Sequence, residues 1–339
     1  MLAWARKQDH PERVVDPGIG SARFLVAAGR RFKEAQLVGA DVDPVATLMA
    51  RAHLSVAGLA GRSQVELLDY RTLEVPKISG RTLYVGNPPY VRHHGITAAW
   101  KQWLTRTAAE RGYKASQLAG LHVHFFLATL EHAQRGDLGA FVTSSEWLDV
   151  NYGSLVRQLL VQDLGGRSIH VVDPKAMPFA DAATTAAITC FEVGAPVTSI
   201  KLKATDSLAD LGDLTKGRKV TRGRLIEAPR WTPLLRVTPQ LPEGYVELGE
   251  LARVHRGTVT GANSVWVTSR AATQLPGSVL TPSVTKAREL FAAGRVLDDP
   301  STLRVVIDLP ADLDELDSEE RKAVERFLPE TDVVIELGG

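Results

Sequence analysis

The sequence has almost no cysteine, no long apolar run and no excess of charge of either sign. Cys190 is the single cysteine among 339 residues, which excludes a disulfide within the chain and fits a reducing compartment. No apolar stretch is long enough to span a membrane and no signal-peptide pattern is present, so we expect a cytoplasmic protein. Lys and Arg number 40 against 39 Asp and Glu, so overall charge neither favours nor excludes a nucleic-acid partner.

Short apolar runs alternate with amphipathic stretches over the first 195 residues. Amphipathic stretches at 21–32, 44–57 and 118–134 predict helices between the runs. The alternation predicts an α/β domain with a mostly parallel sheet, whose ligands bind beyond the carboxyl ends of its strands. The seven expected strands are residues 13–16, 36–41, 64–70, 81–90, 136–145, 168–173 and 186–193.

The composition changes after residue 195. Apolar runs become shorter, prolines accumulate, and "KGRKVTRGR" (216–224) forms a basic cluster, whereas the far end carries the acidic "PADLDELDSEER" (310–321). We therefore expect one domain over 1–195, a basic linker or the start of a second domain over 196–245, and a second domain over 246–339.

The first three strand ends carry glycines or aspartates. In "DPGIGS", Gly18 and Gly20 allow a tight turn and close approach to a ligand, although an ordinary glycine-rich turn has the same pattern. Asp41 can accept hydrogen bonds from ribose hydroxyls, while Asp43 before a proline suits a helix N-cap. Asp69 can accept from an adenine amino group or merely cap a turn. Together these ends predict a cofactor that contains a nucleoside, with its charged tail near the glycines.

The fourth strand ends in "GNPPY". Two prolines stiffen the turn and leave the Pro88 carbonyl beside the side-chain oxygen of Asn87. Two adjacent acceptors suit a planar amino group, and Tyr90 offers a face on which a flat ring can stack. The structural alternative is a strand that ends on prolines with a partly buried tyrosine. The three preceding strand ends favour the binding interpretation.

The ordered segments "DPGIGS", "VGADVDP", "LLDY" and "VGNPPYV" resemble the class I S-adenosylmethionine-dependent methyltransferases. More narrowly, residues 13–295 resemble adenine-N6 DNA methylases of type II restriction-modification systems. Segments 141–160 and 177–191 are similar to later family segments, and 248–267 and 280–291 are similar to the start of a target-recognition domain. The resemblance implies a Rossmann-like seven-stranded sheet whose last strand is antiparallel, so that 1–195 is catalytic and 246–339 is part of the recognition domain.

Carried over by position, the resemblance implies a role for each of the first three strand ends. Asp16, Gly18 and Gly20 line the methionine end of S-adenosylmethionine. Asp41 holds the ribose hydroxyls, and Asp69 contacts the cofactor adenine. Ala22 stands where many relatives carry another glycine.

The "NPPY" residues are the catalytic set that the resemblance implies. Asn87 and Pro88 bind the target amino group, Pro89 stiffens the turn, Tyr90 stacks on the target base, and Phe179 falls where the family carries a second stacking aromatic. The base is flipped out of the duplex, and its nitrogen attacks the methyl group directly, mostly through positioning. Cytosine-C5 chemistry does not fit, because Cys190 lacks the preceding proline of that family's nucleophile.

Basic residues outside the strand ends are further candidates for DNA contacts, with structural alternatives. Residue 92 faces either nucleic acid or solvent, the cluster at 216–224 contacts phosphates or is a linker, and residue 256 is a candidate by resemblance only. The candidates are Arg92, Lys216, Arg218, Lys219, Arg222 and Arg256.

The segment 92–119 is longer than an ordinary connection and carries Trp100 and Trp103, so it either borders DNA or is a packed helical insertion. His122 and His124 follow on a helical stretch, where packing fits better than metal binding. No Cys/His spacing resembles a zinc site, and we expect no metal.

Double-stranded DNA is the expected partner, together with either a restriction endonuclease or a chain that supplies a missing segment. Only "MLAWARKQDHPE" precedes the first strand, where the family usually has a longer segment, and the chain stops where the recognition domain normally continues. We therefore expect a chain truncated at both ends, which a partner chain completes. The alternatives are an "NPPY" methyltransferase for cytosine N4, rRNA guanine or protein glutamine, and a non-catalytic fragment that binds DNA or a partner subunit.

Overall fold

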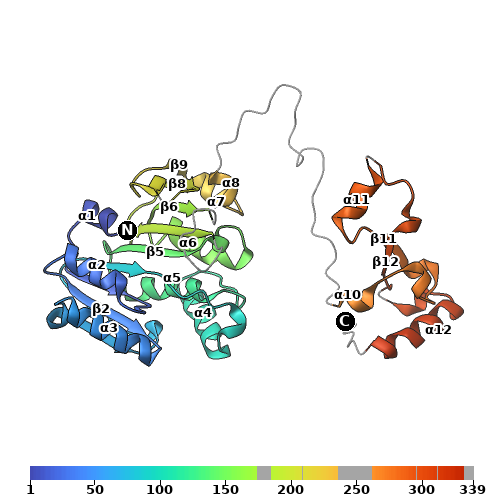
Figure 1. The fold of residues 1–339 in the computed structure, drawn as a ribbon, viewed down its shortest axis with the longest axis horizontal. Helices are drawn as coiled ribbons and strands as arrows, with labels where there is room; N and C mark the ends of the chain where they lie inside the picture. Colours follow the sequence, from blue (N-terminus) through green and yellow to red (C-terminus); the bar gives the residue numbers. More distant parts are fainter. Residues whose placement is uncertain (174–184, 208, 236–261, 295, 311, 332–339) are drawn as a thin grey trace, which may run out of the picture. The chain divides into compact units, whose positions relative to one another are not determined.

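The chain forms two units, Met1–Pro239 and Gln240–Gly339, in the computed structural model (Figure 1). The structure describes residues 1–173, 185–207, 209–235, 262–294, 296–310 and 312–331.

A large mixed sheet runs through the first unit. Its order is β3-β2-β1-β4-β5-β7-β6-β8-β9 among the described residues. β7 is antiparallel to both of its neighbours, β9 is antiparallel to β8, and the remaining pairs are parallel. The strands are β1 (Arg13–Asp16), β2 (Gln36–Asp41), β3 (Ser63–Leu67), β4 (Thr82–Gly86), β5 (Leu138–Ser144), β6 (Gly166–Val172), β7 (Ala186–Glu192), β8 (Ser199–Thr205) and β9 (Arg218–Thr221).

All seven expected strands form, and the antiparallel direction of β7 is confirmed. The expected total of seven is wrong, because β8 and β9 extend the same sheet beyond β6. β8 alternates buried Ile200 and Leu202 with half-exposed Lys201 and Lys203, as a strand with one solvated face does. The first unit therefore includes β8 and β9, which lie in the segment that we expected to be a basic linker or the start of a second domain.

Helices cover both faces of this sheet (Figure 1). Side chains of α1, α2 and α3 form one apolar core with one face, and side chains of α4 to α8 form the other core. None of the helices in the described ranges is long and apolar enough to cross a membrane. The helices are α1 (Leu2–Gln8), α2 (Arg23–Arg31), α3 (Pro44–Val56), α4 (Ala98–Glu110), α5 (Leu121–His132), α6 (Ser154–Val161), α7 (Arg222–Glu227) and α8 (Thr232–Leu235).

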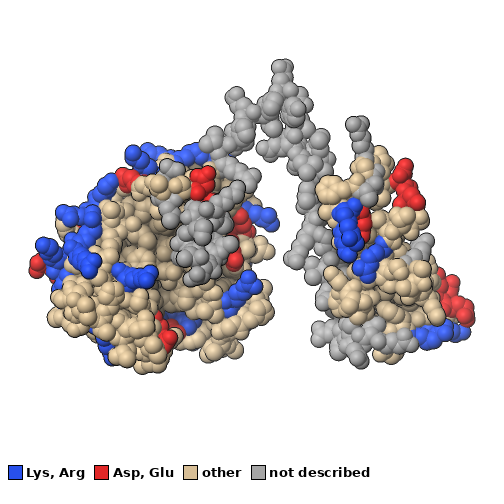
Figure 2. All heavy atoms as spheres, viewed as in Figure 1, with Lys and Arg blue, Asp and Glu red and all other residues tan. Residues whose placement is uncertain are grey.

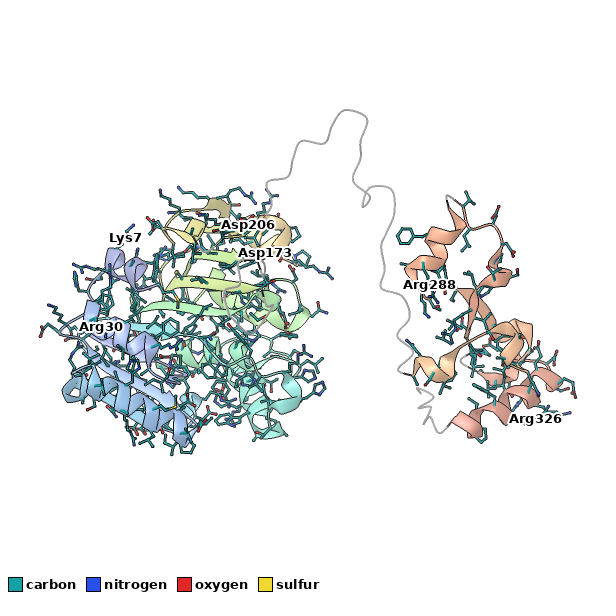
Figure 3. The ribbon with its side chains drawn as sticks, viewed as in Figure 1. Lys7, Arg30, Asp173, Asp206, Arg288 and Arg326 are labelled. Atoms are coloured by element: carbon teal, nitrogen blue, oxygen red, sulfur yellow. The ribbon has the colours of Figure 1, made fainter. Side chains whose placement is uncertain are left out.

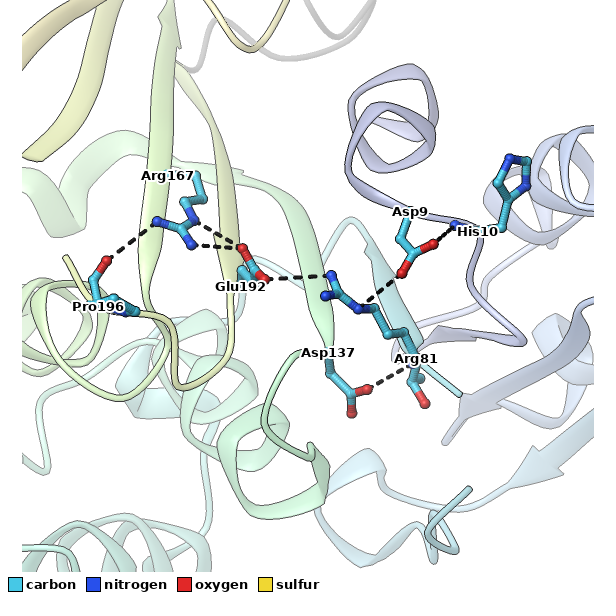
Figure 4. Close-up of polar contacts among 8 residues, drawn as sticks. Asp9, His10, Arg81, Asp137, Arg167, Glu192 and Pro196 are labelled. Carbon is cyan, nitrogen blue, oxygen red and sulfur yellow. Dashed lines mark hydrogen bonds and ion pairs between the residues drawn. The ribbon is translucent and has the colours of Figure 1, made fainter. Parts of the chain in front are cut away.

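A charged network closes the edge at which the parallel strands begin (Figure 4). Glu192 at the end of antiparallel β7 accepts from Arg167 at 2.7 Å and pairs with Arg81 at 3.5 Å. Arg81 also pairs with Asp9 at 3.2 Å. The Asp137 carboxylate accepts the Thr82 backbone N–H at 2.8 Å. These contacts hold four strands and the segment before β1 together.

The second unit has a small antiparallel sheet of order β10-β12-β11. Its core includes Val279, Val305 and Val324. Acidic and basic side chains lie side by side around α12, and Arg321 pairs with Glu325 at 2.8 Å (Figure 2). The described elements are α10 (Asn263–Trp266), β10 (Val267–Thr268), β11 (Leu280–Ser283), α11 (Ala287–Ala293), β12 (Arg304–Ile307) and α12 (Ser318–Phe327).

Candidate active site

Four adjacent parallel strands end side by side at one edge of the large sheet. Because the order is β3-β2-β1-β4, their ends place Asp69, Asp41, Asp16 and Asn87 in a row. Three strand spacings separate β3 from β4, roughly 14 Å. The same edge continues to β6 and β8, after which Asp173 and Asp206 follow (Figure 3). The expected cofactor and "NPPY" residues are thus brought together.

Asp16 lies at the centre of this row and is fully buried. No hydrogen bond of ordinary geometry reaches either carboxylate oxygen from the described residues, although the Gly18 backbone N–H lies close enough to influence the carboxylate. Burial raises the pKa of Asp16 to about 8; the nearby Gly18 amide opposes the shift, and the Asp41 carboxylate adds to it. A Cβ on Gly86 would lie 2.5 Å from Asp16 Oδ1, so glycine is needed there. The site therefore contains a buried acid without a partner, which suits a cationic ligand group.

The turn after β1 contacts both neighbouring strand ends. A Cβ on Gly18 would meet Pro89 Cδ at 3.5 Å, which places this backbone against the "NPPY" turn. The Gly20 backbone N–H donates to Asp41 Oδ2 at 2.9 Å, and Gly20 has a φ of +50°. Ala22 adopts a φ of +63°, a region that glycine enters without strain.

Asp41 and Asp43 have different roles in the structure. The sequence predicts that Asp43 caps a helix, and it does so. Asp43 caps α3, because its Oδ1 accepts from Val45 N at 2.8 Å with Pro44 at the first helical position. Asp41 is half-exposed and accepts from Gly20 and from the Asp43 backbone N–H at 3.1 Å. These two bonds fix the Asp41 carboxylate at the strand end, where its half-exposed position leaves it accessible to hydroxyl donors.

The "NPPY" turn presents one unsatisfied acceptor and one exposed ring. Asn87 Oδ1 is buried without a hydrogen-bond partner among the described residues. Tyr90 is 41% exposed, and burial of the rest of the ring raises the pKa of Tyr90 to about 12. The hydroxyl therefore stays protonated at neutral pH. A buried amide oxygen and a partly exposed aromatic ring suit a flat ring with an amino group.

A cavity of about 430 Å³ opens beside Tyr90. This volume is in the usual range for small-ligand sites. Glu146 Oε2 accepts from the Tyr152 hydroxyl at 2.9 Å inside it, so the wall opposite the "NPPY" turn is polar. The lining residues are Tyr90, Val91, Arg92, His93, Leu118, Gly120, His122, Ser144, Glu146 and Tyr152.

His122 and His124 are both buried on α5. Burial lowers the pKa of His122 to about 4 and the pKa of His124 to about 3, so both imidazoles are neutral. His124 stacks on Trp103 with ring centroids 6.0 Å apart. Among the described residues, no group of three metal-ligating side chains is arranged around a common point. The segment 92–119 is a packed helical insertion in this structure, since Leu104 and Ala108 of α4 enter the core.

The basic cluster is not near this row of strand ends. β9 lies five strand positions from β4, roughly 24 Å away. Within the cluster, Arg222 Nε donates to the Val161 carbonyl at 3.3 Å and Arg218 donates to the Leu234 carbonyl, whereas Lys216 and Lys219 are exposed. Two further expected residues, Phe179 and Arg256, lie outside the described residues.

Comparison with known proteins gives a family for the central segment. Residues 82–175 match the Eco57I restriction-modification methylase family. The chain is also 49% identical to the type II methyltransferase M.XamI of Xanthomonas campestris pv. amaranthicola, over 328 residues. The chain is thus similar to a type II restriction-modification methylase over nearly all of its length, and its central segment matches the family model. The match covers 97% of this chain and 62% of M.XamI, so the chain spans about three fifths of that relative.

Solved structures with low sequence identity share the fold. The type IIG restriction endonuclease BpuSI is 13% identical, with a TM-score of 0.56 over 97% of this chain and 43% of that protein. The type I restriction-modification methyltransferase subunit from Streptococcus thermophilus is 14% identical, with a TM-score of 0.50 over 66% of this chain and 48% of the subunit. The first unit thus has the methyltransferase-like α/β fold, with a large mixed sheet.

S-adenosylmethionine is the cofactor that this relationship implies. The residues present fit it. The unpartnered Asp16 carboxylate suits an ammonium group, a Cβ on Gly20 would meet no atom within 4 Å, and Asp41 offers acceptors for hydroxyls. Three residues of the site escaped sequence reasoning. Gly86 could have been found from its place beside "NPP"; Arg71, two positions after Asp69, and Glu146 gave no distinctive signal.

Proposed function

We propose that the chain is a site-specific DNA methyltransferase that transfers a methyl group from S-adenosylmethionine to the N6 amino group of a flipped adenine. One observation carries the proposal. The exposed Tyr90 ring lines a cavity three positions after Asn87, whose side-chain oxygen is buried without a partner among the described residues, and both follow the same sheet edge as the buried, unpartnered Asp16 carboxylate. Buried acceptors without partners are rare in folded proteins, and a donor group of a bound ligand is one way to satisfy them.

The proposed binding of the cofactor divides it among three strand ends. Asp16 receives the ammonium group, beside the turn at Gly18 and Gly20. Asp41 receives the ribose hydroxyls, and Asp69 receives the adenine amino group. When bound, the cofactor supplies a methyl group on a sulfonium. The protein's task at this end is to orient that group and to exclude water from it.

The proposed catalytic turn acts on the target base. Asn87 Oδ1 and the Pro88 carbonyl accept the two amino hydrogens, which localises the nitrogen lone pair toward the methyl group. Pro89 fixes the turn, and Tyr90 stacks on the base, with Phe179 proposed as the second aromatic. Catalysis by positioning needs no nucleophilic side chain.

Double-stranded DNA is the proposed substrate, and the second unit is proposed as part of a target-recognition domain. Arg92 lines the cavity beside Tyr90 and is the basic candidate nearest to the base. Exposed Lys216 and Lys219 remain candidates for phosphate contacts, together with Arg256, whereas Arg218 and Arg222 already donate to backbone carbonyls. A restriction endonuclease is the proposed protein partner.

Incubation of the purified chain with isotopically labelled S-adenosylmethionine and genomic DNA tests the proposal, with nucleoside mass spectrometry as the readout. We expect labelled N6-methyladenine in DNA. Labelled methylcytosine, methyl transfer to protein or RNA alone, or no transfer at all would each contradict it. A chain of the same preparation that carries Asn87→Ala is the matched negative control.

A further inference from the structure

Arg71 has a buried side chain that binds the carboxylate of Asp69, one of the residues expected to contact the cofactor. Its side chain is 4% exposed. Nε donates to Asp69 Oδ1 at 2.8 Å, and Nη2 donates to Asp69 Oδ2 at 2.6 Å. The Arg71 backbone N–H also donates to Asp69 Oδ1, at 3.0 Å. A planar guanidinium bound at both oxygens fixes the carboxylate plane as well as its charge.

The third nitrogen of the guanidinium contacts His124, which lies 53 positions further along the chain. Arg71 Nη1 lies 3.0 Å from His124 Nδ1 on α5. Because arginine only donates, Nδ1 must accept and the imidazole proton must sit on Nε2. Burial keeps the pKa of His124 near 3, so the ring remains an acceptor across the physiological range.

Two tryptophans of α4 complete the enclosure. Arg71 Cζ lies 3.7 Å from the centroid of the Trp100 ring and 6.0 Å from that of Trp103. Such contacts are attractive, because the face of an indole ring is electronegative. The helical insertion at 92–119 therefore reaches the third strand end through Arg71.

Asp69 keeps acceptor capacity in this arrangement. Its side chain is 22% exposed, and Oδ2 accepts one hydrogen bond from the described residues, whereas Oδ1 accepts two. Burial raises the pKa of Asp69, but the hydrogen bonds and charge of Arg71 outweigh burial and leave that pKa below its ordinary value. An ionised carboxylate whose Oδ2 can accept a further hydrogen bond selects for a ligand with an N–H donor.

We propose that Arg71 is a positioning residue for the cofactor adenine, which orients Asp69 so that Oδ2 receives the 6-amino group, and that Trp100 and His124 hold Arg71 in place. The inference rests on the proposed function, since it assumes a cofactor that contains adenine. It assigns the α4 insertion a role in the selection of the cofactor.

Two ligands that differ at the purine 6-position test this role. S-adenosylhomocysteine carries the 6-amino donor, whereas S-inosylhomocysteine carries a carbonyl oxygen there. Calorimetric titration of the full chain should give a ratio of dissociation constants of roughly tenfold or more in favour of S-adenosylhomocysteine, since the site's acceptor is charged. In Arg71→Gln the ratio should fall to within about threefold of unity. Arg71→Lys keeps the positive charge but loses the two parallel N–H donors of the guanidinium. Its ratio of dissociation constants should lie between those of Arg71→Gln and the wild type.

Equal weakening of both ligands in Arg71→Gln, with the wild-type ratio retained, would overturn the inference, because it would show a general structural role. Because substitution of the buried Arg71 could disturb folding, Trp100→Leu serves as a second test that leaves Arg71 and Asp69 unchanged. It should lower the ratio by roughly two- to threefold, and an unchanged ratio would contradict the role of α4. Arg106→Gln on the exposed side of α4 is the matched control and should match the wild type. No binding of either ligand to the wild-type chain would instead contradict the proposed function.

Discussion

Several charged groups at one edge of the large sheet are paired with each other, whereas two buried side chains at the other edge have oxygens without a partner among the described residues. Where the parallel strands begin, Arg81, Glu192 and Arg167 form a chain of ion pairs, and nearby carboxylates accept backbone N–H groups (Figure 4). Where the strands end, Asp16 and Asn87 are buried with side-chain oxygens that lack a partner among the described residues. Both edges belong to the same strands, so the difference does not come from a difference in fold.

The comparison distinguishes polar groups that stabilise the first unit from polar groups that are available to bind a ligand. A buried polar group without a partner costs free energy, whereas a paired one is close to neutral or favourable. The unpaired edge is therefore maintained at the expense of stability, which is expected where a ligand supplies the missing partners. Changes at the two edges should accordingly have opposite effects on stability and on binding.

The largest effect is expected from Asn87→Ala. Loss of the amide oxygen removes one of two acceptors for the target amino group, so kcat should fall at least about a hundredfold. Cofactor affinity should stay within about twofold, since the Asn87 side chain is proposed to face the base rather than the cofactor. Transfer of labelled methyl groups to DNA measures the first quantity and calorimetry the second. Exposed Asn151→Ala is the control; wild-type kcat in Asn87→Ala would show that the turn has another role.

Asp16→Asn should separate binding from stability at the unpaired edge. Affinity for S-adenosylhomocysteine should fall roughly tenfold or more, because a charged partner for the ammonium is lost. In the absence of cofactor, the same substitution should instead raise the free energy of unfolding near neutral pH. Folded Asp16 keeps its proton up to about pH 8, whereas the unfolded chain releases it near pH 3.8. Wild-type stability is therefore lost as the pH rises through this interval, by up to about 1.4 kcal/mol per pH unit.

In Asp16→Asn this loss should disappear, so that the free energy of unfolding changes less between pH 5 and pH 8 than in the wild type. Urea denaturation at several pH values measures it. An identical pH dependence in the two proteins would mean that Asp16 is paired in the cofactor-free chain.

At the paired edge, Glu192→Gln should lower stability without weakening binding. The variant loses the charge that both Arg81 and Arg167 contact, in a partly exposed network, so we expect a loss of roughly 1 kcal/mol in the free energy of unfolding. Affinity for S-adenosylhomocysteine should remain as in the wild type. A fall in affinity with unchanged stability would reverse the assignment of the two edges.

The smallest effect is expected from Lys219→Ala, on the last strand of the sheet. Its side chain is exposed and belongs to neither edge's network. We expect a few-fold loss of DNA affinity that is equal for all sequences, and a reduction of about one in the slope of log affinity against log salt. Fluorescence anisotropy over a salt series measures both. An unchanged slope would remove β9 from the DNA-binding surface.

Much of this arrangement follows from the sequence, because strand ends are visible in it. Apolar runs that stop on Asp, Gly or Asn-Pro give both the strands and the edge at which their ends meet, which is why Asp16, Asp41 and Asn87 were expected together. The continuation through β8 was missed, because the half-exposed Lys201 and Lys203 interrupt its apolar pattern.

Long-range partners were not predictable in the same way. Arg71 lies 53 positions from His124, and no periodicity links Asp69 to the tryptophans of α4. The unpaired state of the Asp16 carboxylate likewise depends on how the strand ends pack against each other. Sequence patterns therefore predicted the polar residues at the strand ends, whereas their charge states and their supporting residues depend on three-dimensional packing.

Calorimetric titration of the wild-type chain with S-adenosylhomocysteine near pH 7, in two buffers with different ionisation enthalpies, tests the central claim most directly. If the buried Asp16 carboxyl loses its proton to pair with the ligand's ammonium group, close to one proton should be released per molecule bound. Asp16→Asn should release none. Binding of the wild type without proton release, or the absence of binding, would contradict the assignment of the unpaired sheet edge as the cofactor site.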